Sequence, residues 1–110
     1  MTDFLLPPGY ADLSPEEKAR IVNGCGPGNW KLDLVPDELL GVDIEEPCNV
    51  HDYEYWLGKD RAQADARLHA NILIACLAQH PHRLPLLIPL ANAYFLAVHE
   101  GGASHFGRAA

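Results

Sequence analysis

A glycine loop, a histidine–aspartate pair and a third acid are the residues of this chain whose types and spacing could do chemistry. The loop is Gly24-Cys25-Gly26-Pro27-Gly28-Asn29, the pair is His51-Asp52, and the third acid is Asp65. The backbone carbonyls of a tight glycine loop, together with the Asp52 carboxylate, suit a hard cation such as calcium. His51 beside them could activate a water molecule. Together these residues outline a metal-assisted hydrolase site.

Two helices are expected to position the histidine and the third acid. Pro47 is typical of a helix start, and Gly58 is typical of the residue that ends one. Asp60 is a good cap for a second helix, which we expect to run to about Gln79. Because the connection between them is short, the two helices should form an antiparallel hairpin.

The hairpin brings the candidate residues to the same level. His51 is seven residues before Gly58, and Asp65 is seven residues after it. At about 1.5 Å per residue both lie roughly 10 Å from the turn, so the two side chains can meet across the pair. On the first helix His51 and Tyr55 share a face, whereas Asp52 is turned by about 100° and can point toward the glycine loop.

The rest of the chain predicts two more helices and little else. Ser14-Pro15-Glu16-Glu17 has the pattern of a capped helix start, and that helix should run into the glycine loop. Residues 30–40 are interpreted as an extended loop without a strand. An apolar helix is expected from Leu84 or Pro85 to His99, and it is more typical of a cover for the hairpin than of a membrane anchor.

The length of the chain indicates how many domains it has, and its charge indicates which partners are disfavoured. A chain of 110 residues predicts one domain, with an N-terminal segment (1–13), the loop and hairpin (14–79), a C-terminal helix (80–100) and a tail (101–110). The net charge of −7 disfavours nucleic acid as a partner. The first residues do not read as a secretory signal, and no transmembrane segment is expected. The delivery route is left open: the protein could act outside the producing cell or in a phage particle.

The three cysteines suggest one bridge and one thiol. A bridge between Cys25 and Cys48 would tie the glycine loop to the first helix of the hairpin, and two reduced, buried thiols are the alternative. Cys76 lies in an apolar helical stretch and is expected to be free.

These motifs together resemble the phospholipase A2 superfamily. Its sites combine a Cys-Gly-x-Gly calcium loop with a Cys-x-x-His-Asp-x-x-Tyr helix and an Asp on the next antiparallel helix. Here they read Cys25-Gly26-Pro27-Gly28, then Cys48-Asn49-Val50-His51-Asp52-Tyr53-Glu54-Tyr55, then Ala64-Asp65-Ala66-Arg67-Leu68. The chain is most similar to the compact version of this domain in parvovirus capsid proteins and related phage or bacterial proteins. The match covers roughly residues 23–72.

The resemblance implies a role for each matching residue. Calcium would be held by the backbone carbonyls of Gly24, Gly26 and Gly28 and by the Asp52 carboxylate, and the Gly26 amide would help to hold the oxyanion. His51 would take a proton from the attacking water. Asp65 would orient the imidazole, and Tyr55 would hydrogen-bond Asp65.

The chain also departs from the secreted members of the family. Glu54 and Ala64 stand where those proteins have cysteines, and the linker between the helices is too short for their β-hairpin. In the family a second tyrosine supports the acid that corresponds to Asp65. The sequence does not assign its counterpart here, and Tyr10 and Tyr94 are the two candidates. The other five histidines, His69, His80, His82, His99 and His105, are interpreted as surface or satisfied core residues.

The sequence therefore predicts a mainly α domain, a phospholipase A2-like antiparallel helical hairpin with an N-terminal calcium loop and a C-terminal apolar helix. The expected activity is calcium-dependent hydrolysis of the sn-2 ester of phospholipids at a membrane or micelle surface. The apolar residues Phe4-Leu5-Leu6, together with Trp30, Leu32 and Leu34, either complete a core or form a rim that touches lipid. The main alternative is a non-catalytic calcium-binding or structural module with a phage or secretion-machinery partner. A zinc hydrolase is a weaker alternative, because carbonyl-rich loops suit calcium.

Overall fold

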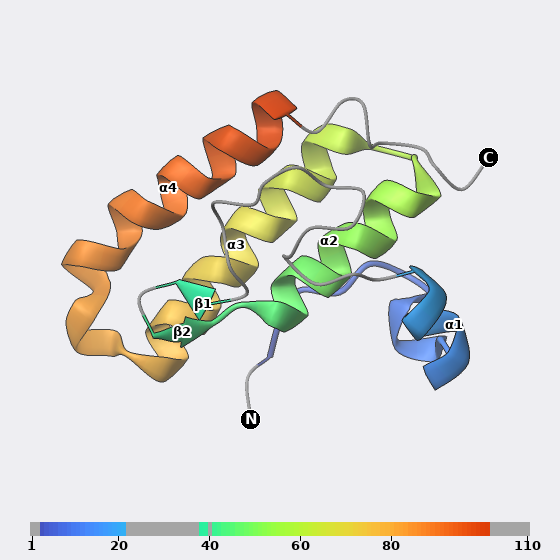
Figure 1. Ribbon diagram of the computed structural model, residues 1–110, viewed down its shortest axis with the longest axis horizontal. Helices are drawn as coiled ribbons and strands as arrows, with labels where there is room; N and C mark the ends of the chain where they lie inside the picture. Colours follow the sequence, from blue (N-terminus) through green and yellow to red (C-terminus); the bar gives the residue numbers. More distant parts are fainter. Residues whose placement is uncertain (1–2, 22–37, 40, 102–110) are drawn as a thin grey trace.

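Three long helices dominate the structure, a computed structural model that describes residues 3–21, 38–39 and 41–101. They are α2 (Glu45–Leu57), α3 (Arg61–Gln79) and α4 (Leu84–Gly101). Helix α3 lies between α2 and α4 and packs against both (Figure 1). The predicted mainly α class is confirmed, and α2 and α3 form the predicted hairpin. The predicted calcium loop lies outside the described residues.

The turn of the hairpin is made by the two residues that the sequence singles out. Gly58 adopts the left-handed conformation, with φ 69°, and its amide donates to the Glu54 carbonyl at 3.0 Å. Only glycine reaches this conformation without a Cβ penalty, so α2 ends here. Asp60 then caps α3, because its Oδ1 accepts the Gln63 amide at 3.0 Å. Helix α2 starts before the predicted Pro47, at Glu45, whose amide donates to the Asp43 side chain.

The short elements flank the hairpin. Helix α1 (Pro15–Ile21) starts with the predicted capping box, in which the Ser14 and Glu17 side chains each accept the other residue's amide. It follows the 3-10 helix η1 (Tyr10–Asp12), and a second 3-10 helix, η2 (Pro81–Arg83), precedes α4. The interpretation of 30–40 as loop is wrong at its end: β1 (Glu38–Leu39) pairs antiparallel with β2 (Val42–Asp43). Gly41, with φ 84°, permits the tight turn between them.

The main core lies where α3 meets α4 and the start of α2. It contains Val42, Ile44, Cys48, Leu68, Ile72, Ala75, Cys76, Leu87, Ala91, Tyr94 and Val98. The four members from α4 follow the spacing of one helix face, so α4 covers the hairpin as expected. Its opposite face is exposed: Leu86 keeps 62% and Leu96 56% of its accessible surface. No described helix is long and apolar enough to cross a membrane.

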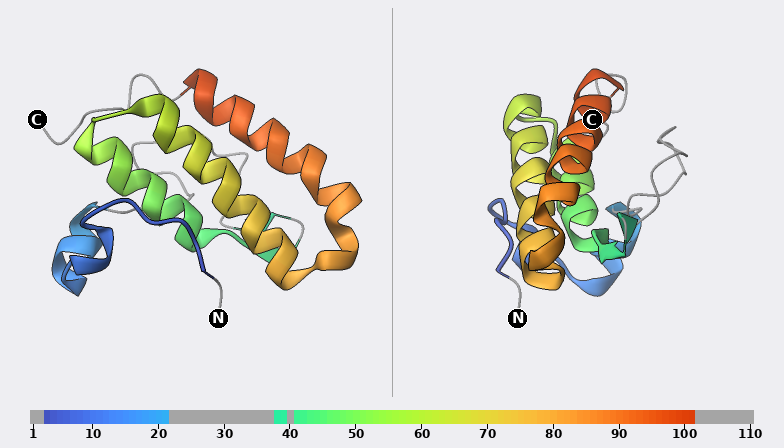
Figure 2. Two further views of the ribbon diagram at one scale, coloured as in Figure 1. Left: turned by 180° about the vertical axis from the view of Figure 1, so that it is seen from behind. Right: turned by 90° about the vertical axis from the view of Figure 1, so that its left-hand side faces the viewer.

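Two side-chain amides on α3 hold segments that are distant in sequence. The buried Asn71 accepts the Leu5 amide at 2.7 Å and donates to the Leu5 carbonyl at 2.9 Å. Gln79 makes the same pair of bonds with the backbone of Asp43 in β2, at 2.8 and 2.9 Å. As Figures 1 and 2 show, the N-terminal segment and the strand pair thereby lie on opposite faces of the hairpin.

Candidate functional site

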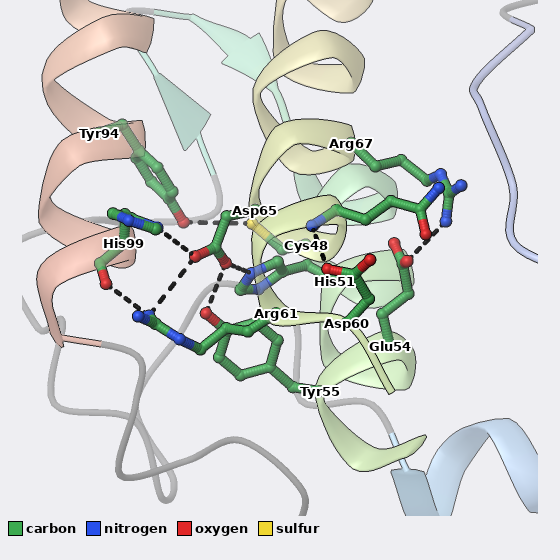
Figure 3. A network of polar contacts seen from close by, with 11 residues as sticks. Cys48, His51, Glu54, Tyr55, Asp60, Arg61, Asp65, Arg67, Tyr94 and His99 are labelled. Atoms are coloured by element: carbon green, nitrogen blue, oxygen red, sulfur yellow. Dashed lines mark hydrogen bonds and ion pairs between the residues drawn. The ribbon is translucent and has the colours of Figure 1, made fainter. Parts of the chain in front are cut away.

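His51 and Asp65 meet between α2 and α3 as the spacing predicts. The His51 Nε2 lies 2.8 Å from the Asp65 Oδ1, and the Tyr55 hydroxyl donates to the same oxygen at 2.5 Å (Figure 3). All three side chains are buried, with Asp65 fully inaccessible. The His51 and Tyr55 rings, one helical turn apart, are in contact with centroids 4.1 Å apart. The structure thus brings together three of the predicted site residues.

Asp65 has two further partners that the sequence analysis did not assign to the site. The His99 Nδ1, from the end of α4, lies 2.9 Å from the Asp65 Oδ2. The Arg61 guanidinium, one turn before Asp65 on α3, lies 3.7 Å from the same oxygen. His99 is thus a partly exposed, hydrogen-bonded histidine, within the interpretation made from the sequence, and its partner is the candidate acid. The i, i+4 spacing of Arg61 and Asp65 could have predicted that pair, but nothing local predicts the contact of His99.

The surroundings keep Asp65 ionised and His51 neutral. Burial raises the pKa of Asp65, but the hydrogen bonds from His51, Tyr55 and His99 outweigh it and hold the pKa below its usual value. Burial lowers the pKa of His51, although the neighbouring Asp65 acts in the opposite direction. Because Asp65 accepts, His51 carries its proton on Nε2, which makes Nδ1 the basic nitrogen. A neutral imidazole fixed in this tautomer is suited to accept a proton.

Tyr55 completes this network as a hydrogen-bond donor. Burial, followed by its bond to Asp65, raises the pKa of the Tyr55 phenol well above its usual value. The phenol therefore keeps its proton at neutral pH. It donates that proton to Asp65 and contributes no charge of its own to the site.

Asp52 is the one predicted calcium ligand within the described residues. It lies next to His51 on α2 and is half-buried. Gly24, Gly26 and Gly28, the other predicted ligands, lie outside those residues. Across 3–21, 38–39 and 41–101, no group of three or more His, Cys, Asp or Glu side chains could hold a metal ion. Within the described residues the predicted calcium ligands are therefore represented by the Asp52 carboxylate alone, an oxygen ligand of the kind that calcium prefers.

The two tyrosines considered as second supports for Asp65 bond elsewhere. The Tyr10 hydroxyl donates to the Glu46 carboxylate at 2.8 Å, and the Tyr94 hydroxyl lies 3.3 Å from the Cys48 sulfur. Cys48 is disulfide-bonded, so it has no thiol proton, and Tyr94 is the donor. The Oδ2 of Asp65 is instead contacted by His99.

An ion pair joins the two helices of the hairpin. Glu54 on α2 pairs with Arg67 on α3 at 2.5 Å, and Ala64 on α3 is fully buried. Burial raises the pKa of Glu54, while Arg67 opposes the rise. The Arg67 side chain keeps 17% of its accessible surface, and the Glu54 side chain keeps 10%. The ion pair lies apart from Asp65, as Figure 3 shows.

The state of the cysteines leads to a prediction. Cys76 is free and buried, as expected, whereas the expected partner of Cys48, Cys25, lies outside the described residues. Alkylation in denaturant without reductant should label Cys76 alone, as measured by peptide mass spectrometry. A Cys25–Cys48 bridge would close a loop of about two dozen residues and stabilise the fold by roughly 3 kcal/mol. Labelling of Cys25 in the unreduced protein would contradict this pairing.

No protein-family model, curated protein or solved structure matches this chain.

Proposed function

We propose that this protein is a calcium-dependent phospholipase A2 that hydrolyses the sn-2 ester of glycerophospholipids. The observation that carries the proposal is the buried His51–Asp65 pair, in which a neutral imidazole donates through Nε2 to an ionised carboxylate. Asp52, which the resemblance assigns to calcium, is the next residue on the same helix. A general base and a metal-binding carboxylate thus occupy adjacent positions.

The residues of the chain would act in turn during hydrolysis. The Nδ1 of His51 takes a proton from the attacking water. The imidazolium that forms keeps its other proton on Nε2, where it is hydrogen-bonded to Asp65. The negative charge of Asp65 stabilises that imidazolium, and Tyr55 holds the accepting oxygen in place. His51 then returns the proton to the leaving alcohol oxygen. The Gly26 amide is our candidate for holding the oxyanion.

Calcium, when bound to Asp52 and the loop carbonyls, would polarise the ester carbonyl and neutralise the substrate phosphate. Zinc is a poorer candidate because it prefers nitrogen and sulfur ligands. The negative charge of the chain, −7, also favours binding of a cation over binding of a free anion.

The outer face of α4 supports a lipid substrate. Residues Leu84–Val98 include no Asp, Glu, Lys or Arg, and the exposed side chains of Leu86, Ile88, Leu90 and Leu96 lie on this helix. The same helix ends beside Asp65, through His99. A neutral apolar face of this kind fits a neutral or zwitterionic lipid surface better than an anionic one. Leu5 and Leu6 are also exposed, whereas Phe4 packs against the core.

The alternative is a calcium-binding or structural module without catalysis. Such a module would have no need for a buried histidine with an ionised carboxylate behind it, because that pair requires desolvation of both groups. The reaction itself tests the proposal: phospholipid labelled in the sn-2 chain should release labelled fatty acid, and phospholipid labelled in the sn-1 chain should not. Release from sn-1, or from neither position, would favour another ester substrate or the structural module.

Calcium should raise the melting temperature, because an ion that binds only the folded chain stabilises it by RT ln(1 + [L]/Kd). At a calcium concentration of 100 times Kd the gain is about 2.7 kcal/mol, which is about ten degrees for a domain of this size. The measurement is a thermal melt with calcium and with chelator. The Asp52→Asn variant should lose most of this shift. A melt that calcium leaves unchanged would count against a calcium site.

A further inference from the structure

The carboxylate of Asp65 lies between two histidines, one on each oxygen. Its Oδ1 accepts from His51 and Tyr55, at 2.8 and 2.5 Å, and its Oδ2 is contacted by His99 and Arg61, at 2.9 and 3.7 Å (Figure 3). The first pair comes from α2, whereas the second pair comes from α4 and from α3 itself. Asp65 is therefore restrained from three helices.

His99 is itself held in place by its neighbours. The Arg61 guanidinium donates to the His99 backbone carbonyl at 2.6 Å, which satisfies a carbonyl in the last turn of α4. The His99 ring stacks on Phe95, with centroids 5.7 Å apart and planes inclined by 14°. Its side chain keeps 43% of its accessible surface, so it closes the network on the solvent side. Arg61 thus fixes the end of α4 and pairs with the acid that α4 contacts.

We infer that His99 is a second positioning residue of the site, which holds the Asp65 carboxylate so that its other oxygen stays on His51. The inference rests on the proposed role of His51 as the base. It extends the functional unit beyond the loop and hairpin, because α4 then supplies a contact on which the orientation of the imidazole depends.

The physical reason is the freedom of an aspartate side chain. The terminal torsion of aspartate has a broad energy minimum, so bonds to one oxygen alone leave the carboxylate plane able to rotate. A donor on the second oxygen removes that rotation. It also gives a close hydrogen bond to a buried oxygen whose other contact, the Arg61 guanidinium, lies at 3.7 Å. Because the Asp65 Oδ1 is the partner of His51 Nε2, rotation of the carboxylate would misalign the base.

Three variants test this role. In His99→Asn the amide nitrogen takes the place of Nδ1 and can still donate to Asp65, whereas in His99→Gln it is displaced along the side chain. We expect His99→Gln to lower kcat about ten- to a hundredfold with KM unchanged, and His99→Asn to recover most of the loss. His69→Gln is the matched control, because His69 also packs on Phe95 but bonds to Asn92. It should keep the parent kcat.

A double-mutant cycle separates positioning from general stability. If His99 acts through Asp65, His99→Gln should cause no further loss of kcat in an Asp65→Asn background. Multiplicative losses in the cycle, or equal kcat for the Gln and Asn variants, would overturn the inference.

A readout without catalysis distinguishes failure of this inference from failure of the proposed function. In NMR spectra the Nε2 proton of His51 should be protected from exchange by its bond to Asp65. We expect that protection to fall in His99→Gln and to persist in His99→Asn and His69→Gln. Unchanged protection in His99→Gln would show that His99 does not position Asp65, even if the parent hydrolysed no ester.

Discussion

Replacement of His51 by glutamine is expected to abolish ester hydrolysis and to leave calcium affinity unchanged. The amide nitrogen of glutamine can occupy the position of Nε2 and still donate to Asp65, so the buried network is preserved. The amide offers no basic nitrogen to accept the proton of water. Loss of general-base catalysis alone is worth about two to four orders of magnitude in rate. Fatty-acid release measures the activity, and calorimetric titration measures calcium binding.

The matched control for this variant is His82→Gln. His82 is exposed in η2, far along the chain from the hairpin turn, so its replacement should change neither activity nor calcium affinity. Activity retained in His51→Gln would remove His51 from the role of base. Loss of calcium binding together with activity would instead indicate that His51 supports the fold of the metal site.

The second large effect is expected for Asp65→Asn. Removal of the negative charge behind His51 leaves the imidazolium unstabilised and permits the wrong tautomer, so kcat should fall by about a hundred- to ten-thousandfold. The asparagine side chain has the same shape, and it can still accept from Tyr55 at one atom. A circular dichroism spectrum like that of the parent would show that the loss is not unfolding. A kcat within a few-fold of the parent would contradict the role of Asp65.

The same variant should change how stability depends on pH. The pKa of Asp65 is lower in the folded state than its usual value, so the ionised carboxylate stabilises the fold above that value, and this contribution is lost as the pH falls through the folded-state pKa. The difference in melting temperature between parent and Asp65→Asn should therefore be largest near neutral pH and narrow toward pH 3. A difference in melting temperature that grows as the pH falls would contradict a lowered pKa of Asp65.

The hairpin could be predicted because its signals are local. Gly58 and Asp60 mark the end of one helix and the start of the next, and the equal spacing of His51 and Asp65 from the turn then determines their contact. The position of Tyr55 on the same helix face as His51 follows from the helical repeat. These inferences need only the rise and periodicity of a helix.

The contact of His99 could not be predicted in this way. It depends on how α4 packs on α3, and the register of two packed helices is set by many side chains in the core. His99 also stands 34 residues from Asp65, with no motif around it. The strand pair was missed for a related reason, because each strand has only two residues and forms through the turn at Gly41.

The outer face of α4 is a third feature that the sequence leaves ambiguous. An apolar run without charge predicts burial. One face of α4 is buried against α3, yet Leu86, Ile88, Leu90 and Leu96 are exposed. Periodicity does not separate an inner from an outer apolar face when both are apolar. This exposed face is one of the observations from which we propose a lipid substrate.

Fatty-acid release from mixed phospholipid micelles, with calcium and then with chelator, tests the account most directly. We expect release that requires calcium, stops on chelation and resumes when calcium is restored, with the Asp52→Asn protein inactive throughout. Release that persists in chelator would contradict the calcium mechanism. A parent protein that binds calcium but releases no fatty acid from any phospholipid would contradict the enzyme and favour the structural module.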